Sequence, residues 1–374
     1  MTAHAARLQM STWRWAFLLL IAGGAVASLL AKFQTIGAAT GLSDSVPWGL
    51  CLGLNVFCGI ALAAGGLSLA AILAVLNGRN WRTLGRVSLL VGSIGYVVAM
   101  LGMVANEAIE RHLWTTIIRG WSSRSILSGA LWTVLLLTCL LLVEFLPDLS
   151  PRLSNTRSFA GLARLKVPLL FGATGLAVLH QLGLDRLIGL AEARFSPLWS
   201  GPELSLMFYM SALAGTLAVI LFASWRCWLA FDKSLPAPVI PAVARALTIT
   251  VFLYLLVRFM DLIERGLFTS IFRLSREGLL LLFEIVVLLL GMMWIKGNEL
   301  NPRELFYGSA LIIAGLVANR LNTAITALEA NAGQYYLPHW GEFLISYSLI
   351  AAGIGAFAMG VEHLTVFSTV DPVS

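Results

Sequence analysis

Several long apolar stretches of this sequence carry single residues of the kinds that bind ligands and move protons. Arg258, Asp261 and Arg265 are spaced three and four residues apart, so a helix would place them on one face. Asp261 could then pair with either arginine. Other apolar stretches carry further polar groups: Asn55, Asn106, His180, Glu284 and Arg320. Because ionisable groups are costly inside a membrane, a functional role is the first hypothesis for them.

The chemistry open to this set is ligand binding coupled to proton transfer. Histidine and carboxylates serve as general acids or bases, and arginine stabilises developing negative charge. A pocket of this kind would suit an amphipathic ligand such as a quinone, whose two carbonyl oxygens need hydrogen-bond donors. The candidate proton-transfer residues are Asp261, His180 and Glu284. The candidate quinone-binding residues are Trp48, Asn55, Asn106, His180, Arg258, Asp261 and Arg320.

Each of these residues also has a structural explanation. The arginine–aspartate trio could be an ion pair at a helix end, and His180 alone could be a packing histidine. The functional hypothesis is favoured because polar groups occur in six different apolar stretches, each time near the same end. The opposite end offers little beyond Glu144.

The elements that must position these residues are transmembrane helices. The 374 residues are 59% hydrophobic and 12% charged, against roughly 25% charged in soluble domains. About 20 apolar residues span a bilayer, and the backbone there must be helical unless it forms a closed barrel, whose alternating pattern is absent. We predict one all-α transmembrane domain over 1–374, with about ten spans at 13–36, 46–76, 83–106, 126–147, 165–188, 203–230, 243–263, 278–295, 303–322 and 341–365.

The distribution of basic residues predicts the orientation of these spans. Of the 25 Lys and Arg residues, 14 fall on the N-terminal side of the membrane and 11 on the other side. Since cytoplasmic loops carry the excess of Lys and Arg, both termini are expected in the cytoplasm. The polar groups then gather near the outer face.

Several other classes of site are not indicated. The net charge of +6 is spread over short loops, which argues against nucleic acid as a partner. Four cysteines lie in or beside apolar stretches without a CxxC pattern, so no metal site is expected. Of the five histidines only His180 lies inside a span, whereas two bis-histidine haems would need four. We therefore expect no haem.

A proline followed by tryptophan recurs before three of the predicted spans: at Pro47-Trp48, Pro197-Leu198-Trp199 and Pro338-His339-Trp340. Tryptophan in the interfacial belt and proline at a helix start explain this pattern. An old duplication is the alternative, with two four-helix bundles over the halves 46–188 and 203–322 and flanking helices.

The order of several stretches resembles a known family of membrane subunits. They are "GLSDSVPWGLCLGLNVFCGIALAAGGLSLA" (41–70), "LHQLGLDRL" (179–187), "FSPLWS" (195–200), "LVRFMDLIERG" (256–266), "FEIVV" (283–287), "NRLN" (319–322) and "QYYLPHWGEFLIS" (334–346). Together they resemble the NrfD/HybB-type (polysulfide-reductase-like) subunits, most of all the cytochrome-b-like subunits of nickel–iron hydrogenases.

The resemblance implies a haem-free, multi-pass subunit of the inner membrane of a bacterium, which binds menaquinone or ubiquinone near the outer face. It also implies two partners: a periplasmic ferredoxin-like iron–sulfur subunit, and a catalytic oxidoreductase subunit of hydrogenase or molybdopterin type. Trp48, His180, Arg258, Asp261, Glu284 and Arg320 match polar or anchoring positions of the family. Three acids of the hydrogenase-type relatives are missing, at Asn55, in the run 106–109 and at Gly129. Proton translocation is therefore not expected, unless a neighbouring acid such as Glu107 compensates for them.

The leading hypothesis is a quinone-reactive membrane subunit of a periplasm-facing redox complex, in contact with membrane lipid. A secondary transporter is one rival; it would bind near the midplane, at interrupted helices. A purely structural anchor is another, and its outer polar groups would face a partner protein.

Overall fold

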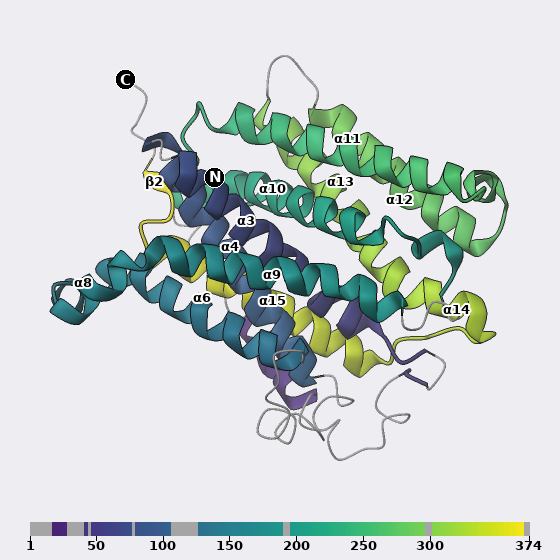
Figure 1. The fold of residues 1–374 in the computed structure, drawn as a ribbon, viewed down its shortest axis with the longest axis horizontal. Coiled ribbons are helices and arrows are strands. Elements are labelled where there is room, and N and C mark those ends of the chain that lie inside the picture. Colours follow the sequence, from purple (N-terminus) through teal and green to yellow (C-terminus); the bar gives the residue numbers. More distant parts are fainter. Residues whose placement is uncertain are drawn as a thin grey trace.

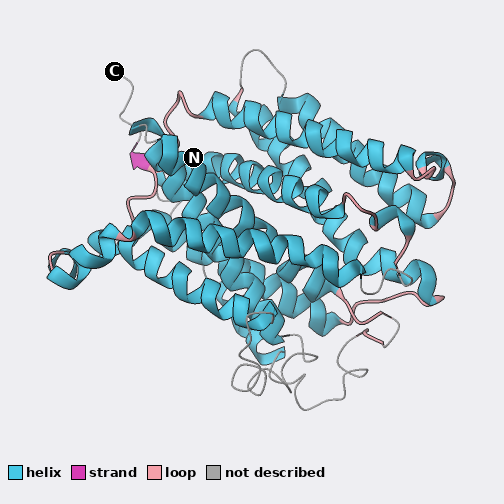
Figure 2. Ribbon diagram, viewed as in Figure 1, coloured by secondary structure: helices cyan, strands magenta, loops and turns pink. Residues whose placement is uncertain are grey.

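The structure is a computed structural model that describes residues 17–27, 41–43, 46–76, 79–105, 126–189, 195–295 and 301–369. The candidate residue Asn106 lies outside the described residues. Figure 1 shows a bundle of long helices and Figure 2 shows how little of the described chain is strand. The helices in chain order are Phe17–Ala27, η1 (Leu52–Phe57), α3 (Cys58–Leu76), α4 (Arg79–Ala105), α6 (Ile126–Leu149), α7 (Pro151–Ser154), α8 (Arg157–Arg164), α9 (Lys166–Gly189), η3 (Pro197–Trp199), α10 (Leu204–Phe231), α11 (Ile240–Glu264), η4 (Phe268–Phe272), α12 (Arg276–Ile295), α13 (Pro302–Leu321), η5 (Asn322–Thr326), α14 (Ala327–Ala332) and α15 (Trp340–His363).

The prediction of an all-α membrane fold is confirmed. Within the described residues, eight helices are long and apolar enough to cross a membrane, and α8 with α9 forms a bent pair that can count as a ninth. The shorter apolar helix Phe17–Ala27 lies in the first predicted span. The ninth predicted span was too short, because its helix continues from Leu321 through η5 and α14 to Ala332.

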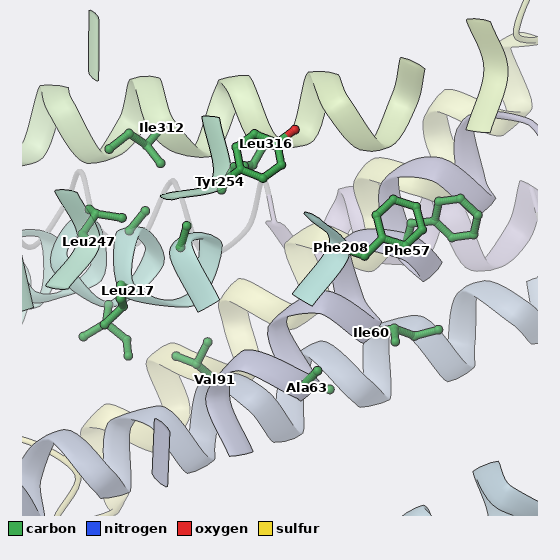
Figure 3. Packing of buried hydrophobic residues seen from close by; sticks show 14 of the residues in the cluster. Phe57, Ile60, Ala63, Val91, Phe208, Leu217, Leu247, Tyr254, Ile312 and Leu316 are labelled. Atoms are coloured by element: carbon green, nitrogen blue, oxygen red, sulfur yellow. The ribbon is translucent and has the colours of Figure 1, made fainter. Parts of the chain in front are cut away.

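The long helices pack in two groups that meet along α3, α9 and α10. In the first group α3 contacts α4 and α9, and α6 contacts α9; in the second, α10 contacts α11 and α13, and α12 contacts α13. Helix α15 packs on the outside of α4. Figure 3 shows Phe57, Ile60 and Ala63 of the first group in the same interior as Phe208, Leu217 and Tyr254 of the second. The arrangement agrees with two four-helix bundles, while the proposed duplication stays a prediction.

Small residues let α3 and α4 approach closely. A Cβ added to Gly66 would lie 2.6 Å from the carbonyl oxygen of Ser88, and one added to Gly59 would lie 2.5 Å from that of Gly95. Lipid gives helices little hydrophobic reason to associate, so close van der Waals contact between small residues is a main source of attraction. This contact fixes η1, which continues into α3, relative to the rest of the bundle.

The connection between α14 and α15 is tied to the start of η1. The Tyr336 hydroxyl accepts from the backbone N–H of Leu50 (2.8 Å) and donates to the Glu342 carboxylate. Burial raises the pKa of Tyr336, and the Glu342 carboxylate adds to the rise, so the hydroxyl keeps the proton that it donates. Glu342 also accepts from the backbone of His339 in a capping box that begins α15.

At the opposite end of the bundle, the segment after α15 returns to the chain following α10. Strands β1 (Lys233–Ser234) and β2 (Ser368–Thr369) pair antiparallel, with Lys233 opposite Thr369. Figure 1 places β2 and α8 at one end of the bundle and α14 at the other.

Candidate functional site

A buried carboxylate, Glu284 of α12, lies at the centre of the polar residues. Its side chain is fully buried and accepts four hydrogen bonds from uncharged donors. Oε1 accepts from the Tyr254 hydroxyl (3.0 Å) and from Asn319 Nδ2 (2.8 Å). Oε2 accepts from Trp199 Nε1 and from Asn322 Nδ2, each at 3.4 Å. Because these donors come from four elements, η3, α11, α13 and η5, the carboxylate joins most of the second helix group.

Two buried arginines lie beside this carboxylate. Arg258 is 1% exposed and Arg320 is 3% exposed. Arg258 follows Tyr254 by one helical turn and Arg320 directly follows Asn319, and both Tyr254 and Asn319 donate to Glu284. Two guanidinium groups against one carboxylate leave an excess of positive charge in an apolar interior. A buried charge of this kind is strongly destabilising unless a hydrogen-bonded partner compensates it.

The hydrogen bonds of these arginines are incomplete. Arg258 donates from Nη1 to the sulfur of Met207 at 3.9 Å, and its Nε and Nη2 have no partner among the described residues. Arg320 donates from Nη2 to the Phe208 carbonyl oxygen (3.0 Å) and to Ser211 Oγ (2.7 Å), while its Nη1 has no such partner. The Arg320 guanidinium also lies over the Phe208 ring, 4.3 Å from the centroid. Buried N–H groups without acceptors are rare, and a molecule with acceptor oxygens would satisfy them.

The carbonyl oxygen of Phe208 links the two helix groups at this site. It accepts from Arg320 of α13 and also from Gln181 Nε2 of α9, at 3.1 Å. Gln181 is fully buried, and its Oε1 has no partner among the described residues. The site therefore extends from Glu284 across α10 to α9.

Asp261 pairs with Arg265 and not with Arg258, which settles the alternative that the spacing left open. Arg265 Nε donates to Asp261 Oδ1 at 3.0 Å, and Nη2 pairs with Oδ2. Arg265 also donates to the Pro197 carbonyl oxygen at 2.6 Å. A Cβ at Gly201, whose φ is 153°, would lie 2.9 Å from Arg265 Cζ. The ion pair thus anchors the loop that carries Trp199, and the part-exposed Arg265 connects Asp261 to the molecular surface.

Two π-helical segments flank the site, η1 with Asn55 and η5 with Asn322. Asn55 is buried against Gly102 of α4, and its Oδ1 has no partner among the described residues. Single π-helical turns inside α-helices are frequent at functional sites because they turn side chains away from the regular register. The two segments contact each other, which places Asn55 close to the end of α13.

His180 and Trp48 lie at the edges of this arrangement. The half-buried His180 ring stacks on Tyr96 of α4, with Nδ1 3.5 Å from the tyrosine hydroxyl. Its neighbour Gln181 is the residue that bonds to Phe208. The half-buried Trp48 packs against Phe57 and Phe195.

The three tryptophans of the repeated motif lie in different surroundings. Trp340 is 64% exposed at the start of α15, as an interfacial residue would be, whereas Trp199 is 1% exposed and donates to Glu284. The interfacial interpretation was therefore wrong for Trp199. Tyr254 was also missed, although it precedes Arg258 by one helical turn and shares its face. No sequence signal pointed to the carbonyl of Phe208.

Two curated relatives match nearly the whole chain, although no protein-family model does. A protein of Nitratidesulfovibrio vulgaris is 22% identical over 360 residues, 93% of this chain and 92% of the relative. The "probable Ni/Fe-hydrogenase 2 b-type cytochrome subunit" of Escherichia coli K12 is 23% identical over 337 residues, 88% of this chain and 86% of the relative. The predicted resemblance to hydrogenase-type membrane subunits is confirmed. This resemblance and the apolar helices agree on a multi-pass membrane protein.

The words "b-type cytochrome" in that relative's name differ from the expectation of a haem-free chain. In the described residues, His180 is the one histidine in the body of a spanning helix, while His339 and His363 mark the beginning and end of α15. No group of three or more His, Cys, Asp or Glu side chains in the described part could hold a metal ion. The absence of haem stays a prediction.

Proposed function

We propose that this chain is the quinone-reactive membrane subunit of a respiratory redox complex. The observation that carries the proposal is the set of buried N–H groups of Arg258 and Arg320 without acceptors, beside the enclosed Glu284 carboxylate. The name of the Escherichia coli relative supports a hydrogenase-type catalytic partner. A ferredoxin-like iron–sulfur subunit on the outer face would pass electrons between that partner and the quinone, without a haem in this chain.

The residues present fit a quinone head group. Menaquinone and ubiquinone carry two carbonyl oxygens, each able to accept from an arginine N–H, and their isoprenoid tails belong among apolar helices. The excess positive charge of Arg258 and Arg320 over Glu284 would stabilise electron density on those oxygens. Asn55 and Gln181 add buried amide oxygens that can accept from a quinol hydroxyl. When bound, the quinone supplies two-electron, two-proton redox chemistry.

Proton exchange would fall to the two acids nearest the arginines. Glu284 is enclosed by neutral donors, whereas Asp261 pairs with the part-exposed Arg265 and so lies nearer the surface. We infer that Asp261 exchanges protons with the outer aqueous side. Glu284 would lie beside the ligand, either as a carboxylate that balances the arginine charges or as a carboxylic acid that holds a proton. We place His180 at the edge of the site, where its ring stacks on Tyr96.

A binding measurement tests the pocket independently of the partners. The purified chain should bind a short-tailed menaquinone or ubiquinone analogue, and Arg258→Met should weaken binding at least tenfold, because a lost charge-assisted hydrogen bond is worth about 1.5–3 kcal/mol. The matched control is Arg245→Met, at an exposed arginine near the other end of α11. If a correctly folded Arg258→Met chain binds the analogue as the wild type does, Arg258 does not belong to a quinone site and the proposal fails.

Two structural observations weigh against the rival functions. Among the described spanning helices, the sharp break lies between α8 and α9, which bend by 53°. This bend is at the end of the bundle distant from Glu284, whereas a transporter is expected to interrupt its helices near the midplane. A purely structural anchor would turn its polar groups toward a partner, but Arg258, Glu284 and Arg320 lie inside the bundle.

A further inference from the structure

A second polar site lies at the end of the bundle remote from Glu284. It is a cleft of about 680 Å³ between the end of α3, the first turns of α4 and α9 and the last turns of α6. Thr365 and Phe367, from the segment that follows α15, close one side. Three candidate spans end beside it, at Leu76, Trp81 and Leu149, so the cleft lies where the bilayer meets water.

The inner part of the cleft is a fixed ion-pair network. Arg86 donates from Nε to Glu144 Oε1 (2.7 Å) and from Nη2 to Asp148 Oδ2 (3.1 Å). Lys166 pairs with the other oxygen of Glu144. Asp148 accepts from the backbone N–H of Thr365 at 3.0 Å, which ties the C-terminal segment to the network. Both carboxylates are thus paired with cations, so neither remains to neutralise a further cation.

The rim of the cleft keeps positive charge available. Arg82, Arg86 and Lys166 oppose the two carboxylates, which leaves one positive charge in excess. Arg82 is exposed, and no hydrogen bond or ion pair joins it to another residue that the structure describes. The Lys166 side chain is 47% exposed despite its pair with Glu144. Both cations can therefore bind an anion from outside.

The remaining walls of the cleft are apolar and run into the membrane. They comprise Ala70, Leu73, Leu89, Leu140, Val167 and Leu170. The partly buried Trp81 lies at the mouth, where an indole ring is favoured between head groups and hydrocarbon. A cationic rim above apolar walls matches a molecule with an anionic head and hydrocarbon chains. Basic pockets between transmembrane helices bind anionic lipid head groups in this way.

We propose that this cleft binds the head group of an anionic phospholipid, held by Arg82 and Lys166, with its acyl chains along α4, α6 and α9. A zwitterionic lipid carries its own cation, which the excess positive charge would repel. The bound lipid would fill the space between the first helix group and the C-terminal segment. It would thereby stabilise the end of the bundle remote from Glu284.

Lipid retention measured by native mass spectrometry tests the site. The delipidated full chain in detergent is titrated with phosphatidylglycerol, with phosphatidylcholine, and with inorganic phosphate alone. Wild-type protein should prefer phosphatidylglycerol, and Arg82→Gln and Lys166→Gln should each weaken that binding about fivefold, the effect of one charge near an anionic head group. Arg245→Gln removes one exposed charge at the same end, outside the cleft, and should bind as wild type.

Three outcomes would overturn the proposal. They are equal affinity for the two lipids, unchanged binding by both cleft variants, and displacement of the lipid by phosphate at equal concentration, which would indicate a free-anion site. Because Arg82 is exposed, Arg82→Gln should melt at the wild-type temperature without lipid. A loss of binding in that variant is then a loss of the site and not of the fold.

Discussion

At the scale of single residues, the decisive feature is a carboxylate inside a membrane bundle that is held by neutral donors. Glu284 lies just over two turns from the start of α12, inside an apolar stretch, and its position alone made it a candidate. Its partners Tyr254, Trp199, Asn319 and Asn322 lie 30 to 85 residues away from it in sequence. Arg258 and Arg320, both buried, complete the cluster.

Glu284→Gln should therefore destabilise the chain strongly although it preserves shape. The amide nitrogen of glutamine cannot accept from two of the present donors, and two buried guanidinium groups lose their nearby anion. We expect the free energy of unfolding to fall by about 3–5 kcal/mol, the cost of breaking a buried charge pair. The measurement is thermal unfolding of both proteins in detergent.

Glu264→Gln is the matched control for that substitution. Glu264 is the last residue of α11 and is exposed, so its replacement should change stability by less than about 0.5 kcal/mol. A Glu284→Gln protein as stable as the Glu264→Gln protein would show that the carboxylate is protonated in the native state.

At the scale of elements, helix contact through small residues positions the site. The α3–α4 contact uses glycines on both helices, and α3 continues from η1, which carries Asn55. Gly175 of α9 differs, because nothing lies within 4 Å of the place where its Cβ would be. Position in the bundle, and not glycine itself, therefore decides the effect of adding a methyl group.

Gly66→Ala is expected to cost about 1–3 kcal/mol of stability, the usual range for overpacking a close contact. The new Cβ would lie 2.6 Å from the Ser88 carbonyl oxygen, so α3 and α4 would have to separate. Gly175→Ala should be neutral or stabilising, since alanine is the better helix former. Denaturant titration followed by circular dichroism compares the two variants; equal effects would contradict the close contact.

At the scale of the whole molecule, the two ends of the bundle carry different chemistry. One end holds the Glu284 cluster and the loop anchored by Arg265, and the other holds the Arg86–Glu144 network and the cationic cleft. The orientation predicted from Lys and Arg places the first end outside and the second in the cytoplasm. That orientation stays a prediction, and it can be tested with one residue from each end.

Cysteine labelling in intact cells tests the orientation. A membrane-impermeant maleimide should label Thr269→Cys in η4 from outside, and should label Ser158→Cys in α8 only after the membrane is permeabilised. Both positions are exposed, whereas the four native cysteines are partly or fully buried. The chain without the new cysteines gives the background. If intact cells label Ser158→Cys and do not label Thr269→Cys, the chain has the opposite orientation.

The sequence by itself determined that this chain is a membrane-spanning helical bundle, because the length and apolarity of its runs leave the backbone no other regular structure in lipid. It also picked out Arg258, Asp261, Glu284 and Arg320, because ionisable residues stand out against an apolar background. Only the tertiary structure decided their partners. Asp261 could reach either arginine along its own helix, and the Pro197 carbonyl and the packing of Gly201 select Arg265. The burial of Trp199 and the role of the Phe208 carbonyl depend on contacts between helices, which helical periodicity alone does not encode.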